Sequence, residues 1–229
     1  LTDFGIAGKI IRLNNYADAR SLIADEIKRG AKTVVIVGND KTFGHVLSGS
    51  ATANCTFGFL PVGNGNSIDE VLGIPVGAEA AAVLSQRLRE RLDIGWVNNR
   101  YFVSQLKAGP GKLSVVYDER FTVTGNDLLD VVVCNLQPYF WKRNKHDPQF
   151  EVVHPQDGKL EAFVRPLTPG RWWGYSYEDP SIFPFSEMEI RGESPFPVEA
   201  DGKLTKEIRI KIKLAPGRIN MIVGRGRKF

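Results

Sequence analysis

Two glycine-containing loops carry residue types that could act on a phosphate group. The first, Gly38-Asn39-Asp40-Lys41-Thr42, combines a carboxylate, a cation and a hydroxyl. The second, Gly63-Asn64-Gly65-Asn66, could cradle phosphate oxygens with its backbone amides, because glycine lets the main chain approach a ligand closely. Neither loop is a Walker A loop, since no G-x-x-x-x-G-K-[ST] occurs. The alternative is that both are tight turns, which Gly and Asn also favour.

Each loop is predicted to lie between a buried strand and a helix. Residues 33–37 and 57–60 are short apolar runs, typical of strands buried on both faces of a parallel sheet. Apolar spacing predicts helices over 16–29 and 77–90, and a shorter one over 42–47. Open α/β sheets bind ligands beyond the carboxyl ends of their strands, where these two loops would lie.

The second half of the chain has a different pattern, with short β-like runs separated by proline and glycine. In Glu207–Leu214, Ile208, Ile210, Ile212 and Leu214 alternate with charged residues, which predicts a half-buried strand. Asn98-Asn99 predicts a hairpin turn. Other strands are predicted at 92–97, 100–103, 113–117, 121–124, 129–134, 150–153, 160–164, 188–191, 197–199 and 218–223. The expected class is α/β plus β: a Rossmann-like nucleotide-binding domain over 1–92, then an antiparallel β-sandwich domain over 93–229.

Composition narrows the classes of function. The 229 residues are 42% hydrophobic and carry a net charge of +4, too small a bias for a dedicated nucleic-acid binder. No apolar run approaches the roughly 18 residues of a membrane span. Cys55 and Cys134 lack a CxxC spacing and suit a reducing compartment, so a cytoplasmic location is expected. The three histidines lack a zinc-site spacing, and no metal ligand is assigned. Because the chain starts at Leu1, we expect it to be incomplete at the N-terminus.

The order of short motifs resembles that of diacylglycerol-kinase and sphingosine-kinase type lipid kinases. Those kinases carry G-G-D-G-T, P-L-G-T-G-N-D, a leucine-glycine-isoleucine-proline stretch, R-x-I-D-L-G…N-x-R-x-F, D-G-x-L and P-x-P-V-x-x-D-G-E. The similar segments here are Val35–Thr42, Pro61–Ser67, Leu72–Pro75, Arg91–Gly95 with Asn99–Phe102, Asp157–Leu160 and Ser194–Gly202. Six weak matches in the right order over nearly the whole chain make the resemblance fairly specific.

The resemblance implies a nucleotide-binding domain and a β-sandwich domain with the active site between them. ATP with Mg²⁺ would be the phosphoryl donor and a lipid alcohol the acceptor. Such chemistry needs phosphates held in place, charge neutralised and a base near the attacking hydroxyl. Carried over by position, the resemblance assigns Asp40 and Asp201 as catalytic residues. It assigns nucleotide binding to Gly38, Asn39, Lys41, Thr42, Gly63, Asn64, Gly65 and Asn66.

Four positions depart from the family pattern. Asn39 and Lys41 replace glycines of the first loop, and Ser67 replaces an aspartate. Lys203 stands where the family has the glutamate of D-G-E, which it uses in catalysis. A lysine cannot act as a carboxylate base unless its pKa is strongly depressed. Substitution in space by Glu199 or Glu207 stays open.

Each of the two aspartates could have a structural role in place of a catalytic one. Asp40 could serve as an Asx-turn or helix N-cap residue, and Asp201 as a turn aspartate. Several surface residues could contact lipid or an anionic membrane, or could be ordinary packing, a solvated strand face and a frayed tail. These residues are Trp172, Trp173, Tyr175, Tyr177, Arg209, Lys211, Lys213, Arg225, Arg227 and Lys228.

Three functions are therefore weighed. The first is an ATP-dependent lipid kinase, cytoplasmic or peripheral at the membrane, with a homodimer left open. The alternative is a kinase-fold module that binds nucleotide or lipid without transfer. A nicotinamide-nucleotide kinase, which shares the G-G-D-G-T idea, is the third, and the β-rich second half fits it less well.

Overall fold

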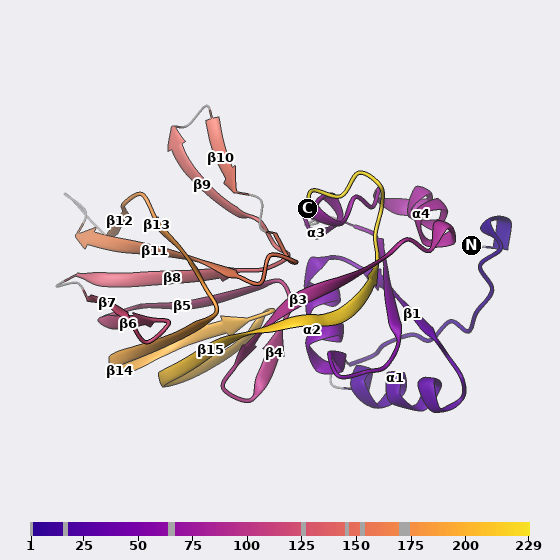
Figure 1. Ribbon diagram of the computed structural model, residues 1–229, viewed down its shortest axis with the longest axis horizontal. Helices are drawn as coiled ribbons and strands as arrows, with labels where there is room; N and C mark the ends of the chain where they lie inside the picture. The colour runs from indigo at the N-terminus through magenta and orange to yellow at the C-terminus, as the bar shows by residue number, and fades with distance from the viewer. Residues whose placement is uncertain are drawn as a thin grey trace.

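A computed structural model describes residues 2–15, 18–63, 67–124, 127–144, 147–151, 154–169 and 175–229. Figure 1 shows the helices gathered at one end of the molecule and most strands at the other, with β3 and β15 running between the two ends. None of the helices in these residues is long and apolar enough to cross a membrane.

The helical end contains a short parallel sheet covered by helices. Its elements are η1 (Thr2–Phe4), α1 (Ala19–Lys28), β1 (Thr33–Gly38), α2 (Asp40–Ser50), β2 (Thr56–Pro61), α3 (Ile68–Leu72), η3 (Gly77–Glu79) and α4 (Ala80–Gln86). Strands β1 and β2 pair in parallel, as the apolar runs predicted. Gly30, with φ +100°, follows α1 in a conformation that favours glycine and ends the helix.

The helix predicted over 77–90 is wrong in its second part. Arg87 adopts φ 52°, a left-handed conformation that ends α4 after Gln86. Residues from Arg89 onward instead form β3 (Arg89–Val97), which pairs with the end of the last strand of the chain. The boundary between α4 and β3 depends on pairing with residues more than a hundred positions away. The local apolar spacing cannot predict that pairing.

The other end consists of antiparallel strands. They are β4 (Arg100–Phe102), β5 (Gln105–Gly111), β6 (Leu113–Tyr117), β7 (Phe121–Thr124), β8 (Leu128–Cys134), β9 (Tyr139–Asn144), β10 (Asp147–Glu151), β11 (Leu160–Pro169), β12 (Tyr175–Tyr177), β13 (Ser181–Phe185), β14 (Glu187–Ala200) and β15 (Lys203–Ile222). Within the described residues, one hydrogen-bonded sheet of 13 strands has the central order β1-β2-β15-β14-β5-β8-β11-β12. The fold is therefore a mixed, mostly strand-rich sheet with helices at one end.

Strand β15 joins the two ends of the molecule. Its first part pairs with β14, its middle and last parts pair with β3, and Asn220 and Met221 pair in parallel with β2. Ile210 and Ile212 are buried in the core of the strand-rich end, whereas Ile219 and Met221 are buried in the core of the helical end. This strand of 20 residues thus contributes to both cores.

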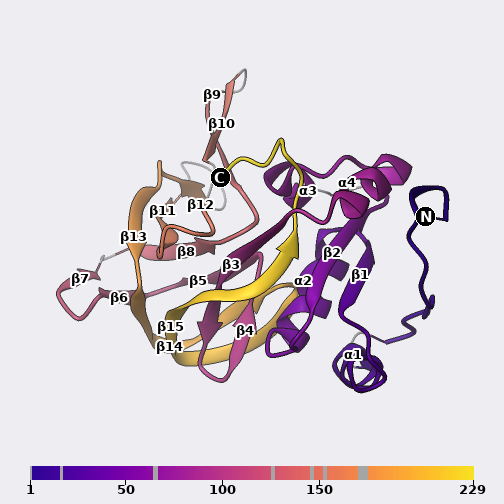
Figure 2. The ribbon, with the colours of Figure 1, turned by 45° about the vertical axis from the view of Figure 1, so that its right-hand side comes forward.

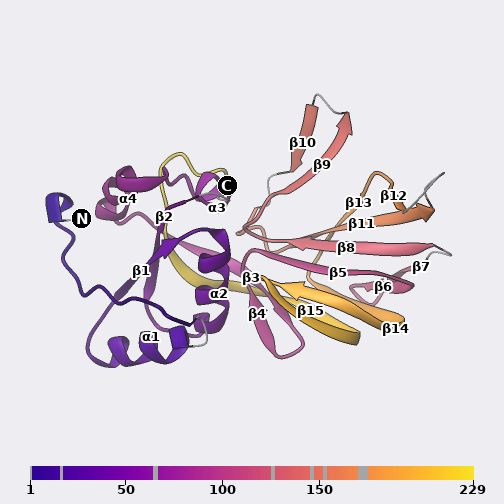
Figure 3. The same ribbon diagram turned by 180° about the vertical axis from the view of Figure 1, so that it is seen from behind.

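Strands β9 and β10 form a separate antiparallel pair outside the main sheet. Figures 2 and 3 show this two-stranded ribbon projecting away from the other strands. Figure 3 also shows the C-terminus beside α3, where Lys228 N donates to Val71 O at 3.0 Å.

Several strands differ from the sequence prediction. Residues 188–191 and 197–199 belong to one strand, β14, and residues 207–214 and 218–222 to one strand, β15. Ile208 does not share the burial of Ile210 and Ile212: it is 58% exposed and lies where the register between β14 and β15 shifts, without a paired residue in β14. The turn at Asn98-Asn99 is confirmed between β3 and β4.

Candidate functional site

The first loop connects β1 to α2, and its polar residues build the start of that helix. Asn39 is the N-cap: its Oδ1 accepts hydrogen bonds from Thr42 N at 3.1 Å and Thr42 Oγ1 at 3.2 Å. A Cβ at Gly38 would lie 2.7 Å from Thr42 Cβ, so this position accepts only glycine without rearrangement. The loop is thus a tight strand-to-helix connection, and only the Lys41 side chain extends from it into solvent.

The buried carboxylate of Asp40 joins the first loop to the second. Its Oδ2 accepts hydrogen bonds from Ser67 N at 2.7 Å and Ser67 Oγ at 2.8 Å, and Ile68 N lies 3.3 Å away. Val62 N donates to Gly38 O at 2.9 Å, which ties the start of the second loop to the first. The two phosphate-loop candidates therefore meet at the carboxyl ends of β1 and β2, as their positions after the strands predicted.

Gly63 lies at this junction with φ +79°, and a Cβ added to it would meet nothing within 4 Å. Its Cα is therefore open on that side, as a phosphate-binding backbone requires. Asn64, Gly65 and Asn66, also predicted to bind nucleotide, lie outside the described residues.

Burial raises the pKa of Asp40 above its ordinary value, and the hydrogen bonds from Ser67 and Ile68 offset this only in part. A carboxylate with a raised pKa is a better proton acceptor near neutral pH than an exposed one. The nitrogen and the hydroxyl of Ser67 both donate to Oδ2, so Asp40 also has a structural role. The alternative that Asp40 is the N-cap of α2 is wrong: Asn39 caps α2, and Asp40 bridges to α3.

Asp201 lies in the turn between β14 and β15, with φ +48°. Its carboxylate is buried and accepts hydrogen bonds from Val103 N at 2.8 Å, from Ser104 N at 2.9 Å, and from the Ser104 hydroxyl. Gln105 N lies 3.4 Å from the same carboxylate. These donors come from the connection between β4 and β5, so Asp201 clamps two turns together. Burial raises its pKa despite these hydrogen bonds.

Helix α2 packs directly on the Asp201 turn, which brings the first loop and the D-G-K segment to one place. A Cβ at Gly44 would lie 3.1 Å from Asp201 Cβ. A Cβ at Gly202 would lie 3.4 Å from both His45 Nε2 and Lys41 Cε. The helix that begins at the first candidate loop therefore carries two basic side chains to the turn of the second half.

His45 had no role in the sequence interpretation, yet it lies in this junction. Burial lowers its pKa, the Asp201 carboxylate opposes that effect, and the ammonium groups of Lys41 and Lys203 add to it. Lys41 and His45 are four residues apart on one helix, so they share a face. The spacing of the two residues could have predicted their shared helix face, but the sequence does not show which segment this face contacts.

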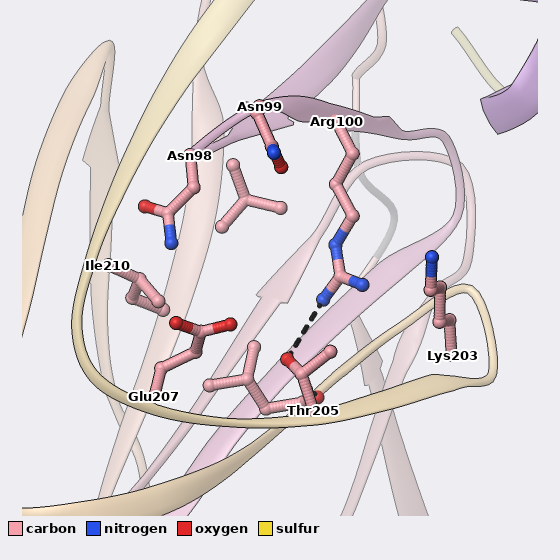
Figure 4. A pocket seen from close by; sticks show the side chains of 9 residues that line it. Asn98, Asn99, Arg100, Lys203, Thr205, Glu207 and Ile210 are labelled. Atoms are coloured by element: carbon pink, nitrogen blue, oxygen red, sulfur yellow. Dashed lines mark hydrogen bonds between the residues drawn. The ribbon is translucent and has the colours of Figure 1, made fainter.

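A pocket of about 360 Å³ begins beside the same turn. It lies between the β3–β4 hairpin and the first part of β15. Figure 4 shows the Arg100 side chain reaching from the hairpin to Thr205, with Lys203 and Glu207 on either side along β15. Arg100 Nη2 donates to Thr205 Oγ1 at 3.3 Å. The lining residues are Val97, Asn98, Asn99, Arg100, Val198, Lys203, Thr205, Glu207 and Ile210.

The two glutamates considered as replacements for the missing carboxylate lie in different places. Glu207 lines the pocket with Lys203, but the two are four residues apart on a strand, so their Cα atoms are separated by about 13 Å. Glu199 lines a second hollow of about 570 Å³, together with Lys107 and Arg165. Neither side chain takes the place that the Lys203 side chain holds.

The residues present can be compared with what ATP and Mg²⁺ need. The exposed Lys41 ammonium and the open space beside the Cα of Gly63 fit a phosphate chain. The described residues contain no cluster of three or more His, Cys, Asp or Glu side chains suited to a metal ion. A Mg²⁺ ion that enters with a nucleotide commonly relies on phosphate oxygens, water and one or two carboxylates. Asp40 is the carboxylate at the junction of the two loops.

Other surface candidates have internal partners. Arg209 Nη2 donates to Glu189 Oε2 at 2.6 Å, and Lys213 Nζ lies 2.9 Å from Glu187 Oε2. The C-terminal tail is not frayed, because Lys228 Nζ donates to Glu70 at 2.6 Å. Arg227 donates to Glu90 at 2.7 Å. Trp172 and Trp173 lie outside the described residues, as do the side chains of Tyr175 and Tyr177.

The first part of the chain is similar in sequence to known proteins. The family model of the diacylglycerol kinase catalytic domain matches residues 1–97. A Pseudomonas aeruginosa protein named "Probable lipid kinase YegS-like" is 29% identical over 96 residues, 41% of this chain and 32% of its own length. The diacylglycerol kinase of Bacillus subtilis is 32% identical over 106 residues, 44% of this chain and 34% of its own. The matched segment thus spans about a third of these curated relatives.

A solved structure adds the fold of the remainder. The crystal structure of a diacylglycerol kinase from Bacillus anthracis strain Sterne superposes with a TM-score of 0.73. The superposition covers 95% of this chain and 85% of that one, at 20% sequence identity. The chain therefore has a diacylglycerol-kinase-like fold.

The resemblance seen in the motif order is confirmed: residues 1–97 match the family model of the diacylglycerol kinase catalytic domain, and this part of the chain is similar to a diacylglycerol kinase and to YegS-like lipid kinases.

Proposed function

We propose that the chain is a diacylglycerol-kinase-like lipid kinase that transfers the γ-phosphate of ATP to a lipid hydroxyl. In this proposal residues 1–92 form the nucleotide-binding domain and residues 93–229 a β-sandwich domain that holds the acceptor. The lipid alcohol would be met at a membrane surface, from the cytoplasmic side. The observation that carries the proposal is the meeting of three separate motifs around Asp40, Ser67 and Asp201.

The proposed roles follow from the contacts. Lys41 and the backbone at Gly63 would hold the phosphates, and Asn39 and Thr42 would fix the start of α2 so that Lys41 points to them. The carboxylate of Asp40 would serve either as the proton acceptor or as the ligand of Mg²⁺, which neutralises phosphate charge when bound. Asp201 would be a positioning residue, since its carboxylate is held by the β4–β5 connection.

One observation favours the second function, a module that binds nucleotide without transfer. Position 203 carries an exposed ammonium group in place of a carboxylate, and Asp201 beside it is committed to backbone donors. No described carboxylate replaces the missing one at that position. Binding would then persist at the Asp40 junction while proton removal from the acceptor is slow.

A paired experiment separates the two functions. The melting temperature is measured with and without ATP and Mg²⁺, and transfer of labelled phosphate to diacylglycerol in mixed micelles is measured with the same preparation. A melting shift with label in the lipid supports the kinase, and a shift without labelled lipid supports the module. Absence of any shift and of any transfer would overturn both.

A further inference from the structure

The pocket between the β3–β4 hairpin and β15 has a charge that the proposed kinase reaction does not use. Two of its lining side chains, Arg100 and Lys203, are cations, and one, Glu207, is a carboxylate. In a transfer site built on the family pattern, position 203 would hold a carboxylate. The substitution therefore reverses the charge at the end of the pocket nearest to α2.

The cations of this pocket are not used in ion pairs within the described residues. The Lys203 ammonium is exposed and has no hydrogen-bond or ion-pair partner there, and Arg100 donates only to Thr205. Elsewhere on β15 the situation is different, because Arg209, Lys211 and Lys213 each pair with a glutamate of β14. An arginine and a lysine left without carboxylate partners beside a cavity are suited to bind an anion from solution.

Lys41 adds to the positive potential at the same end, whereas His45 beside it adds no full charge near neutral pH, because burial lowers its pKa. Lys41 Cε and His45 Nε2 would each lie 3.4 Å from a Cβ at Gly202, next to Lys203 in the chain. Lys41, like Lys203, has no ion-pair partner among the described residues. The Asp201 carboxylate lies at the same turn; its oxygens accept hydrogen bonds from the β4–β5 connection, and its charge also acts on His45. Glu207 lies at the opposite end of the strand segment, where it would repel an anion toward Lys203.

Neutral donors complete the lining. Asn98 and Asn99 project from the hairpin turn over the pocket (Figure 4). Asn98 uses its Oδ1 to accept a hydrogen bond from Lys211 N at 3.0 Å, which directs its amide nitrogen away from that contact. A planar guanidinium, an ammonium and side-chain amides around a small hollow match the several oxygens of a phosphate group.

We propose that the pocket formed by Arg100, Lys203 and the Asn98-Asn99 turn binds a phosphate monoester, as carried by glycerol 3-phosphate in solution or by the head group of phosphatidic acid in a membrane. The site requires no transfer step and no nucleotide, so it goes beyond the proposed function and does not depend on it. It is a binding site adjacent to the nucleotide loops, since Lys41 of the first loop lies beside Gly202, next to Lys203.

The primary test is binding of sn-glycerol 3-phosphate to the full chain in the absence of nucleotide, by calorimetry or by chemical-shift changes. Lys203→Glu is expected to weaken binding by about 10- to 100-fold, because a charge-assisted contact becomes a repulsion. Lys203→Gln should weaken it less. The matched control is Lys206→Glu, an equal charge change at an exposed residue of β15 outside the pocket lining, which should leave binding unchanged.

A second arm identifies the source of the phosphate. Sedimentation with phosphatidylcholine vesicles is measured with phosphatidic acid, and separately with phosphatidylserine, in the bilayer. Recruitment by phosphatidic acid that depends on Lys203 supports a lipid head group, and binding of glycerol 3-phosphate alone supports a soluble ester. Absence of binding in both arms, or an equal loss in Lys206→Glu, would overturn the proposal. Nucleotide binding is measured separately, so failure here leaves the kinase assignment standing.

Discussion

The carboxylate of Asp40 accepts hydrogen bonds from the backbone nitrogen and the hydroxyl of Ser67, at 2.7 and 2.8 Å, across 27 residues of sequence. This contact fixes the end of the second loop and the start of α3 against the start of α2. The resemblance placed an aspartate at position 67 in related kinases, and two carboxylates at this distance would repel each other. Serine at this position instead donates to Asp40, so the departure is structurally compensated.

Replacement of Asp40 should therefore cost stability. Asp40→Ala leaves Ser67 N and Ile68 N without their acceptor in a buried place, and we expect the free energy of unfolding to fall by about 1–3 kcal/mol. Urea unfolding measures this change. Asp25→Ala, at an exposed aspartate of α1 paired only loosely with Lys28, should stay within about 0.5 kcal/mol. Equal effects of the two substitutions would contradict the bridging role of Asp40.

Two glycines of α2 offer a matched pair for the packing of the helix on the Asp201 turn. A Cβ at Gly44 would lie 3.1 to 3.2 Å from three atoms of Asp201, whereas a Cβ at Gly49 meets nothing within 4 Å. Because hydrogen bonds hold the Asp201 carboxylate, we expect Gly44→Ala to destabilise by about 1–3 kcal/mol. Gly49→Ala should stabilise by about 0.5–1 kcal/mol through helix propensity. Stabilisation by both would show that α2 does not press on the turn.

The first half of the fold and the loop junction were predictable because their signals are local. An apolar run followed by Gly, Asn or Asp indicates a buried strand with a loop at its carboxyl end. The structure agrees with this prediction, because β1 and β2 pair in parallel and the loops after them meet. Strand β15 was not predictable as one element, because its pairing passes from β14 to β3 and β2 along 20 residues. Only the three-dimensional arrangement decides which core each part enters.

The candidate site was predictable in part, for a similar reason. Asp40 and the second loop could be paired from the position of each after a parallel strand. Asp201 could not be recognised as a clamp, because its donors, Val103 and Ser104, belong to a connection whose neighbouring strand β5 was not predicted. The contact of His45 with the same turn depends on packing between distant segments and leaves no local trace.

Acid should destabilise the chain partly through the charged face of β14. Hydrogen bonding to Arg209, and then to Arg191, lowers the pKa of Glu189 from 4.5 to about 2. A carboxyl group with a depressed folded-state pKa stabilises the fold above its ordinary pKa, and this contribution is lost as the pH falls from 4.5 toward 2. Glu189→Gln should therefore show a shallower loss of stability over this range than the parent chain, in pH-dependent urea unfolding.

The control for this effect is Glu193→Gln, at a side chain that is 74% exposed and lies 3.8 Å from Lys112. It should leave the acid dependence unchanged. An identical pH profile for the parent chain and Glu189→Gln would mean that the ion pairs of Glu189 do not persist in solution.

A carboxylate at position 203 should favour phosphoryl transfer to the lipid. Lys203→Glu restores the residue type that the related kinases use, and a positioned general base commonly contributes about 10²–10⁴-fold. We expect the rate of diacylglycerol phosphorylation to rise, although the same substitution weakens phosphate binding in the pocket. Turnover in mixed micelles with labelled ATP measures this rate. A lower rate in Lys203→Glu would indicate that the lysine itself takes part in the reaction.

The central claim is that the loops joined by Asp40 and Ser67 bind the phosphates of a nucleotide, and its most direct test is the melting temperature in the presence of ATP and Mg²⁺. Ligand at about 100 times its dissociation constant stabilises a protein by about 2.7 kcal/mol. We expect such a shift for the parent chain and for Lys32→Glu, an exposed lysine before β1, but not for Lys41→Glu. No shift in the parent chain, or an equal shift in Lys41→Glu, would contradict the claim.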